Sequence, residues 1–91
     1  MHLTAYHFTG DPAALAAAHD EMTAKLPLDA LPLRLCVQTG DGILVLDGCP
    51  TAADAEAFQH SHELAAALAD VGLPTPRIES VGEIWSSVGV A

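Results

Sequence analysis

Residues 33–48, LRLCVQTGDGILVLDG, decide the fold because they contain two strand-like runs joined by a tight turn. The runs LRLCVQ and ILVLDG are rich in β-branched and other apolar side chains, which favour strands. The Asp41-Gly42 pair between them is a strong signal for a β-hairpin. We therefore predict two antiparallel strands, at residues 33–38 and 43–48.

Two further strands and two helices flank this hairpin. Asp11-Pro12 supplies an N-cap followed by proline at the first helical position, and Thr51 with Asp54 forms a capping box. Gly72 provides the left-handed residue that ends the second helix. The predicted flanking elements are strands at residues 2–9 and 77–85 and helices from residue 12 to about 26 and from about 52 to 71.

The order of these elements, β-α-β-β-α-β, predicts a ferredoxin-like α+β fold with a four-stranded antiparallel sheet. Both helices are expected to cover one face of the sheet, which leaves the other face bare. The chain of 91 residues is expected to form a single domain, residues 1–91. A short domain in which 51% of the residues are apolar has more hydrophobic surface than it can easily bury alone. We therefore expect a homodimer that covers the bare face.

Charge and hydropathy exclude several classes of protein. The formal net charge is −9, with three basic residues against twelve acidic ones, so a nucleic-acid partner is not expected. No apolar run is long enough to span a membrane, and the first residues lack the features of a signal peptide. Cys36 and Cys49 lie about four residues out of cross-strand register, too far apart for a disulfide. We expect free thiols and a cytoplasmic location.

The pairing of the hairpin strands predicts which side chains share a face. A turn of two or four residues brings Arg34 near Asp47, whereas a turn of three would reverse the register. One face then holds the aliphatic side chains of Leu33, Leu35, Val37, Leu44 and Leu46. The other face holds Arg34, Cys36, Gln38, Ile43, Val45 and Asp47. We expect the aliphatic face to pack under the helices and the mixed face to line a ligand pocket that a second copy of the chain closes.

Three stretches of the sequence resemble a known superfamily. They are MHLTAYHF at the start, the stretch from Val45 through TAADAEAF, and HSHELAAALADVGLPTPRIE. Together they are similar to the dimeric α/β-barrel superfamily, and within it to antibiotic-biosynthesis-type monooxygenases and haem-degrading enzymes. The resemblance implies that two sheets close face to face into a barrel.

The sequence departs from this family at two positions that the resemblance marks as functional. His7 stands where catalytic members place a pocket asparagine, and the chain contains no asparagine. Cys49 stands where many members carry a tryptophan just before the second helix. Haem-degrading members use an axial histidine on the second helix, for which His60 or His62 would be the candidate. Residues two apart on a helix point about 200° apart, so His60 and His62 do not share a metal ion.

The candidate catalytic residue is His7, because an imidazole with an ordinary pKa near 6.5 can exchange a proton at neutral pH. The alternative is a partly buried histidine with a backbone partner. Arg34 either orients a carbonyl or anionic ligand or forms a structural ion pair with Asp47. Trp85 is expected to contact the second subunit or to form a wall of the pocket. The predicted substrate-binding residues are Arg34, Cys36, Gln38, Val45, Asp47 and Trp85.

Three functions remain open on the sequence. The first is cofactor-independent chemistry, as an oxygenase, isomerase or cyclase, on a small apolar carbonyl or aromatic compound, with no bound metal. The second is a homodimer that binds such a compound, or only itself, without catalysis. The third is haem or metal binding through a histidine of the second helix.

Overall fold

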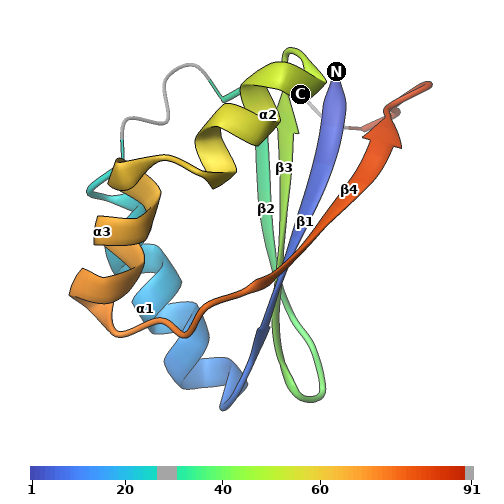
Figure 1. The fold of residues 1–91 in the computed structure, drawn as a ribbon. Helices are drawn as coiled ribbons and strands as arrows, with labels where there is room; N and C mark the ends of the chain where they lie inside the picture. Colours follow the sequence, from blue (N-terminus) through green and yellow to red (C-terminus); the bar gives the residue numbers. More distant parts are fainter. Residues whose placement is uncertain (27–30, 90–91) are drawn as a thin grey trace.

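The computed structural model describes residues 1–26 and 31–89, and its elements follow the predicted order apart from one additional helix (Figure 1). The predicted ferredoxin-like α+β fold is confirmed. The strands are β1 (His2–Thr9), β2 (Leu33–Gln38), β3 (Gly42–Cys49) and β4 (Arg77–Glu83). The helices are α1 (Pro12–Thr23), α2 (Ala52–Gln59) and α3 (His62–Val71).

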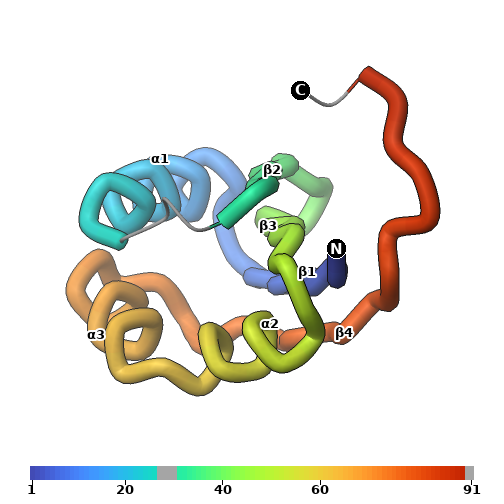
Figure 2. The backbone as a smooth tube through the Cα atoms, turned by 90° about the horizontal axis from the view of Figure 1, so that it is seen from above, coloured from blue at the N-terminus to red at the C-terminus, as the bar shows by residue number. Residues whose placement is uncertain are grey.

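The four strands form one antiparallel sheet in the order β2-β3-β1-β4. All three helices lie on the same side of this sheet, so that the opposite face carries no helix (Figure 2). We call this opposite face the open face. The segment after β4 curves away from the body on the side of the open face (Figure 2).

The hairpin has the register that the even-numbered turn predicts. Arg34 lies opposite Asp47 and Gln38 opposite Ile43, which leaves a four-residue connection. Within that connection the Thr39 amide donates to the Gly42 carbonyl at 2.9 Å. Gly42 has no room for a side chain, because a Cβ atom there would lie 1.8 Å from the Phe8 carbonyl oxygen. The glycine of the turn therefore also allows β1 and β3 to approach each other.

The facing of the hairpin is the reverse of the predicted one. Tyr6 and Phe8 of β1 lie in the core beneath the helices, and they pair directly with Val45 and Ile43 of β3. Directly paired residues share a face, so Ile43 and Val45 also face the helices. The remaining core residues are Leu15, Met22, Leu26, Leu64, Ala67 and Leu73.

The aliphatic set is correspondingly on the open face. Leu35 and Val37 of the edge strand are 46% and 44% exposed, and Leu44 and Leu46 are partly exposed. The prediction that these residues pack under the helices is wrong. The prediction of which hairpin residues share a face was right. The β1–β3 register shows that the two faces point in the directions opposite to those predicted.

The predicted second helix is two helices. The Ser61 hydroxyl accepts a hydrogen bond from the Leu64 amide at 3.2 Å, which makes Ser61 the N-cap of α3. The same hydroxyl donates to the Phe58 carbonyl near the end of α2 at 2.8 Å. Ser61 therefore ends one helix and begins the next. The predicted stop at Gly72 is confirmed, with a φ of 75°.

Among the described residues, no helix has both the length and the apolar character needed to cross a membrane.

Candidate functional site between the helices and the sheet

A row of polar side chains crosses the helix-facing side of the sheet. The register places Arg34 opposite Asp47, Asp47 opposite Thr4, and Thr4 opposite Ser80. We call these four residues the polar row. At its end, the Ser80 hydroxyl lies 2.8 Å from Nε2 of His2. Buried polar groups need hydrogen-bond partners, so the bonds within this row determine which groups remain free for a ligand.

The predicted ion pair between Arg34 and Asp47 is present, and it is buried. Arg34 Nε donates to Asp47 Oδ1 at 2.7 Å, and Nη2 donates to Oδ2 at 2.8 Å. The Asp47 side chain is 0% exposed and that of Arg34 is 10% exposed. The ring of Phe58, on α2, lies 6.0 Å from the guanidinium carbon, within reach of a cation–π contact. The pair therefore lies beneath the helices. The prediction placed it on the open face.

One edge of the Arg34 guanidinium remains free. The guanidinium is planar, and Asp47 occupies the edge formed by Nε and Nη2. Nη1 is directed away from that edge, is buried, and has no hydrogen-bond partner among residues 1–26 and 31–89. The buried Thr4 hydroxyl is also unpaired within the same part of the chain. A buried donor without a hydrogen-bond partner is unusual in a native core. It indicates that a group outside the described residues forms the hydrogen bond.

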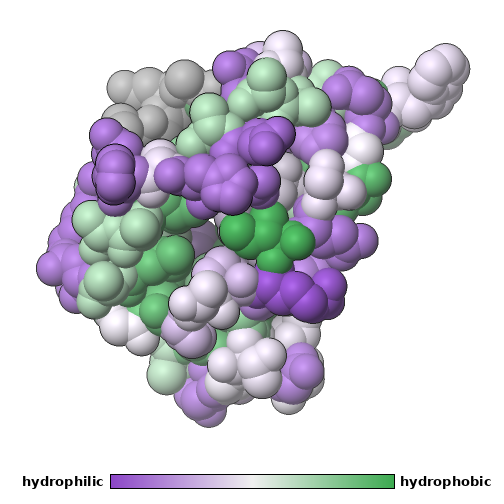
Figure 3. Space-filling model, in the orientation of Figure 1, coloured by the Kyte–Doolittle hydropathy of each residue, from purple (hydrophilic) through white to green (hydrophobic). Residues whose placement is uncertain are grey.

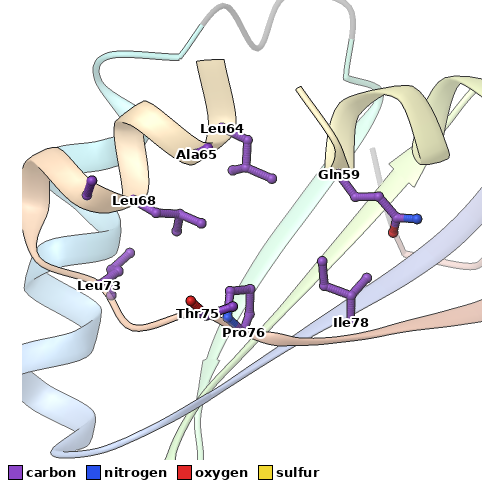
Figure 4. A pocket seen from close by; sticks show the side chains of 9 residues that line it. Gln59, Leu64, Ala65, Leu68, Leu73, Thr75, Pro76 and Ile78 are labelled. Carbon is purple, nitrogen blue, oxygen red and sulfur yellow. The ribbon is translucent and has the colours of Figure 1, made fainter. Parts of the chain in front are cut away.

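An apolar pocket of about 310 Å³ opens between α3 and β4. Figure 3 shows hydrophobic side chains on both sides of this hollow. In Figure 4, Leu64 and Leu68 of α3 and Ile78 of β4 border a common space, with Gln59 at one side. The other lining residues are Ala65, Ala69, Leu73, Thr75 and Pro76. The volume is at the lower end of the range for small-molecule sites, and the apolar walls with a few polar groups are typical of them.

A second, smaller void of about 10 Å³ adjoins this pocket on the inner side. The void and the pocket share Leu64, Leu68 and Pro76 as lining residues, and the void is also bordered by Arg34 and Tyr6. Arg34, whose guanidinium has a free edge, thus borders a void that shares three lining residues with the apolar pocket.

Tyr6 is a hydrogen-bond donor at neutral pH. Burial raises the pKa of its hydroxyl above the ordinary value near 10; the charge of Asp47 adds to this effect, and Arg34 opposes it. The phenol therefore keeps its proton at physiological pH.

His7 lies on the other side of the sheet. It alternates with the buried Tyr6 and Phe8, so it faces the open side, as predicted. Its Nε2 lies 3.1 Å from Oε1 of Glu79, and it pairs across the strands with Arg77. The hydrogen-bond partner of His7 is thus the Glu79 side chain, whereas the alternative in the sequence analysis was a backbone partner. His7 and Arg77 border a separate hollow of about 560 Å³ at the hairpin end of the sheet.

The structure therefore does not bring the predicted site residues together. Arg34, Val45 and Asp47 lie beneath the helices, whereas His7 is on the open face. The prediction of one chamber on the open face that contains all of them is wrong, because the β1–β3 register turns the mixed face of the hairpin toward the helices.

Four predicted substrate-binding residues, Cys36, Gln38, Asp47 and Trp85, lie outside the apolar pocket and its inner void. Cys36 and Gln38 are exposed on the edge strand β2, and Trp85 is 98% exposed beyond the end of β4. Burial raises the pKa of the thiols of Cys36 and Cys49, so neither is activated as a nucleophile at neutral pH. Both cysteines are free.

The candidate haem or metal ligands are the histidines of the predicted second helix. His60 and His62 are exposed, and neither borders the pocket between α3 and β4. Across residues 1–26 and 31–89, no three His, Cys, Asp or Glu side chains are grouped closely enough to bind a metal ion.

The site residues that sequence reasoning missed are Tyr6, Leu64, Leu68, Pro76 and Ile78. Their apolar character is typical of core positions, and no sequence signal separates a side chain that fills a core from one that borders a cavity.

Comparison with known proteins supports the fold. No family model and no curated protein matches this sequence. A matching solved structure is that of a protein from Chloroflexus aurantiacus J-10-fl with the provisional name antibiotic biosynthesis monooxygenase. The two chains share 9% sequence identity over 99% of this chain and 98% of the other, with a TM-score of 0.66. At this identity the likeness shows a shared fold, and it confirms the resemblance at that level.

Proposed function

We propose that this protein is a homodimer that binds a small apolar carbonyl or aromatic compound in the pocket between α3 and β4. One observation carries the proposal: an apolar pocket of about 310 Å³ shares three lining residues with a small void that Arg34 and Tyr6 border. Apolar walls with polar groups at one end suit a compound that is mostly hydrocarbon and has one polar atom. The solved structure with the same fold has the provisional name antibiotic biosynthesis monooxygenase, which agrees with a small-molecule ligand.

The homodimer is supported by the open face. A sheet face that stays in water is normally rich in polar side chains. Here the open face has Leu35 and Val37 on the edge strand β2 and Leu44 and Leu46 on the neighbouring strand β3, all of them partly or largely exposed. An exposed apolar patch on one face of a small domain is typical of a protein interface. A second copy is the proposed partner because two such faces complement each other by symmetry.

Binding is the function that the pocket supports best. The side chains that border the pocket and the inner void include no carboxylate and no imidazole among the described residues. General base catalysis most often uses such a group within hydrogen-bond reach of the reacting atom. Arg34 and Tyr6 can donate hydrogen bonds to a ligand, but neither accepts a proton at neutral pH.

The hydrogen bond between His7 and Glu79 favours a second candidate function. A carboxylate that accepts from one imidazole nitrogen fixes the ring orientation and leaves the other nitrogen to exchange a proton. His7 borders a hollow of about 560 Å³ at the hairpin end of the sheet. In this candidate, cofactor-independent chemistry as an oxygenase, isomerase or cyclase takes place at the interface, with His7 as the acid–base residue.

Two neighbouring residues of α3 provide the test of the pocket. Ala65 borders the pocket and is exposed, so Ala65→Trp should fill the pocket without disturbing the core. Ala66 is also exposed and does not border this pocket, so Ala66→Trp is the matched control. Small aromatic and carbonyl compounds that raise the melting temperature of the wild type should lose this effect with Ala65→Trp alone. Equal loss in both variants, or in neither, would contradict the proposed site.

The two candidate functions predict different results for His7→Ala. If the protein only binds its ligand, this variant behaves as the wild type and no ligand is converted by either protein. If His7 is the acid–base residue, the wild type converts a bound compound, and the variant still binds it but converts it at least about a hundredfold more slowly.

A further inference from the structure

We propose that the free edge of the Arg34 guanidinium is the recognition site for a neutral carbonyl oxygen of the ligand, such as that of a ketone or quinone. This inference rests on the proposed function, because it concerns the inner end of the same pocket. It assigns a chemical class to the ligand and a specific atom, Nη1 of Arg34, to its recognition.

The first argument is the unpaired donor. Two of the three Arg34 nitrogens bond to Asp47, while Nη1 is buried with no partner in the described part of the chain. A buried N–H group that stays unpaired destabilises the protein, whereas an oxygen placed beside it removes that penalty. The 90% burial of the side chain and its two bonds to Asp47 hold the guanidinium in position before a ligand arrives.

The second argument is size. The void that Arg34 borders has a volume of about 10 Å³, which is room for about one water molecule or one ligand oxygen. The adjoining pocket of about 310 Å³ can hold the hydrocarbon body. A single polar atom at the end of an apolar molecule fits this division, whereas a polar group with several oxygens does not.

The third argument is charge, which distinguishes a neutral carbonyl from a carboxylate. Asp47 already neutralises the Arg34 guanidinium. The whole chain has a net charge of −9, so an anionic ligand would enter an unfavourable field. Tyr6, which also borders the void and keeps its proton, supplies a second donor that suits a neutral acceptor oxygen.

Three probes of similar shape test this inference: 1-tetralone with a carbonyl, tetralin without one, and 1-naphthoate with a carboxylate. Their dissociation constants are measured by titration calorimetry. A hydrogen bond to a charged group predicts that the wild type binds 1-tetralone at least about tenfold more tightly than tetralin. It should also bind 1-tetralone more tightly than 1-naphthoate.

The double variant Arg34→Met with Asp47→Leu removes the guanidinium while leaving no unpaired charge. It should bind tetralin as the wild type does and show no preference for 1-tetralone. The variant Tyr6→Phe, which keeps Arg34, should retain most of the preference.

The outcomes separate this inference from the proposed function. If the wild type binds tetralin and 1-tetralone equally well, the carbonyl site is wrong and the apolar pocket stands. If 1-naphthoate binds most tightly, the neutral class is wrong. If none of the probes binds, both the pocket and the carbonyl site are contradicted.

Discussion

Arg34 and Asp47 face each other directly across β2 and β3 and form a two-point ion pair beneath α2, with the Asp47 carboxylate fully buried. Removing one member of such a pair leaves a buried charge without compensation. We therefore expect Asp47→Ala to lower the free energy of unfolding by about 3–5 kcal/mol. Urea denaturation followed by circular dichroism measures this change.

The double variant Arg34→Met with Asp47→Leu is the control for that experiment. Because it replaces the pair with apolar side chains of similar size, its unfolding free energy should equal or exceed that of the wild type. A double variant as unstable as Asp47→Ala would mean that the pair itself, rather than the isolated charge, is needed for the fold.

Gly42 allows the close approach of β1 and β3. We expect Gly42→Ala to destabilise the protein by about 3 kcal/mol or more, because its Cβ would collide with the Phe8 carbonyl oxygen and the backbone cannot move away cheaply. Gly40→Ala, in the same turn, has nothing within 4 Å of its Cβ and should change stability by no more than about 0.5 kcal/mol. Similar melting temperatures for the two variants would contradict this account of the turn.

Association through the open face is testable at the edge strand β2. Leu35→Glu places a carboxylate in the proposed interface, and burying it unpaired costs several kcal/mol, so the dimer dissociation constant should rise about a hundredfold or more. Gln38→Glu adds the same charge on the other side of the same strand and should leave the dimer intact. Sedimentation velocity distinguishes the two. A dimer unaffected by Leu35→Glu would place the interface elsewhere.

Tyr6 makes stability depend on alkaline pH. Its pKa is raised in the folded protein and is near 10 in the unfolded chain, so the unfolded state loses its proton first as the pH rises. The free energy of unfolding should therefore be insensitive to this group below about pH 9 and fall above about pH 10, by up to about 1.4 kcal/mol per pH unit. In the Tyr6→Phe variant, the free energy of unfolding should lack the part of this decrease that the phenol causes.

The chain offers a direct check, because Tyr6 is its single tyrosine. Ultraviolet absorbance of the phenolate then reports one group only. Its titration midpoint should be higher in the native protein than in concentrated urea, and equal midpoints would contradict the burial of the hydroxyl.

The sequence predicted the strands closely because their signals are local. The alternation in residues 33–38 and the Asp41-Gly42 turn predicted the hairpin, and the observed four-residue connection gives the register of an even-numbered turn, including the Arg34–Asp47 pair. The break between α2 and α3 was missed because Ser61 follows residues that favour a continuing helix, and its role as an N-cap depends on where the next helix packs.

The location of the site could not be predicted because it depends on a non-local relationship. Which hairpin face meets the helices follows from the pairing of Tyr6 with Val45, and that register is set by the assembled sheet. An ion pair on one face suggested a solvent-facing or interface position, but the two-point bond makes burial of Arg34 and Asp47 tolerable. The cavity beside them is a gap in packing between elements distant in sequence.

The position of Trp85 determines what intrinsic fluorescence can report for this protein. It is the single tryptophan of the chain, and its indole is already in water in the folded subunit. Its emission spectrum should therefore hardly change when an isolated subunit is denatured. A melting curve recorded from tryptophan fluorescence would miss the unfolding. A blue shift of the emission would instead signal that another surface has covered the segment after β4, which makes the indole a built-in reporter of contact with a partner.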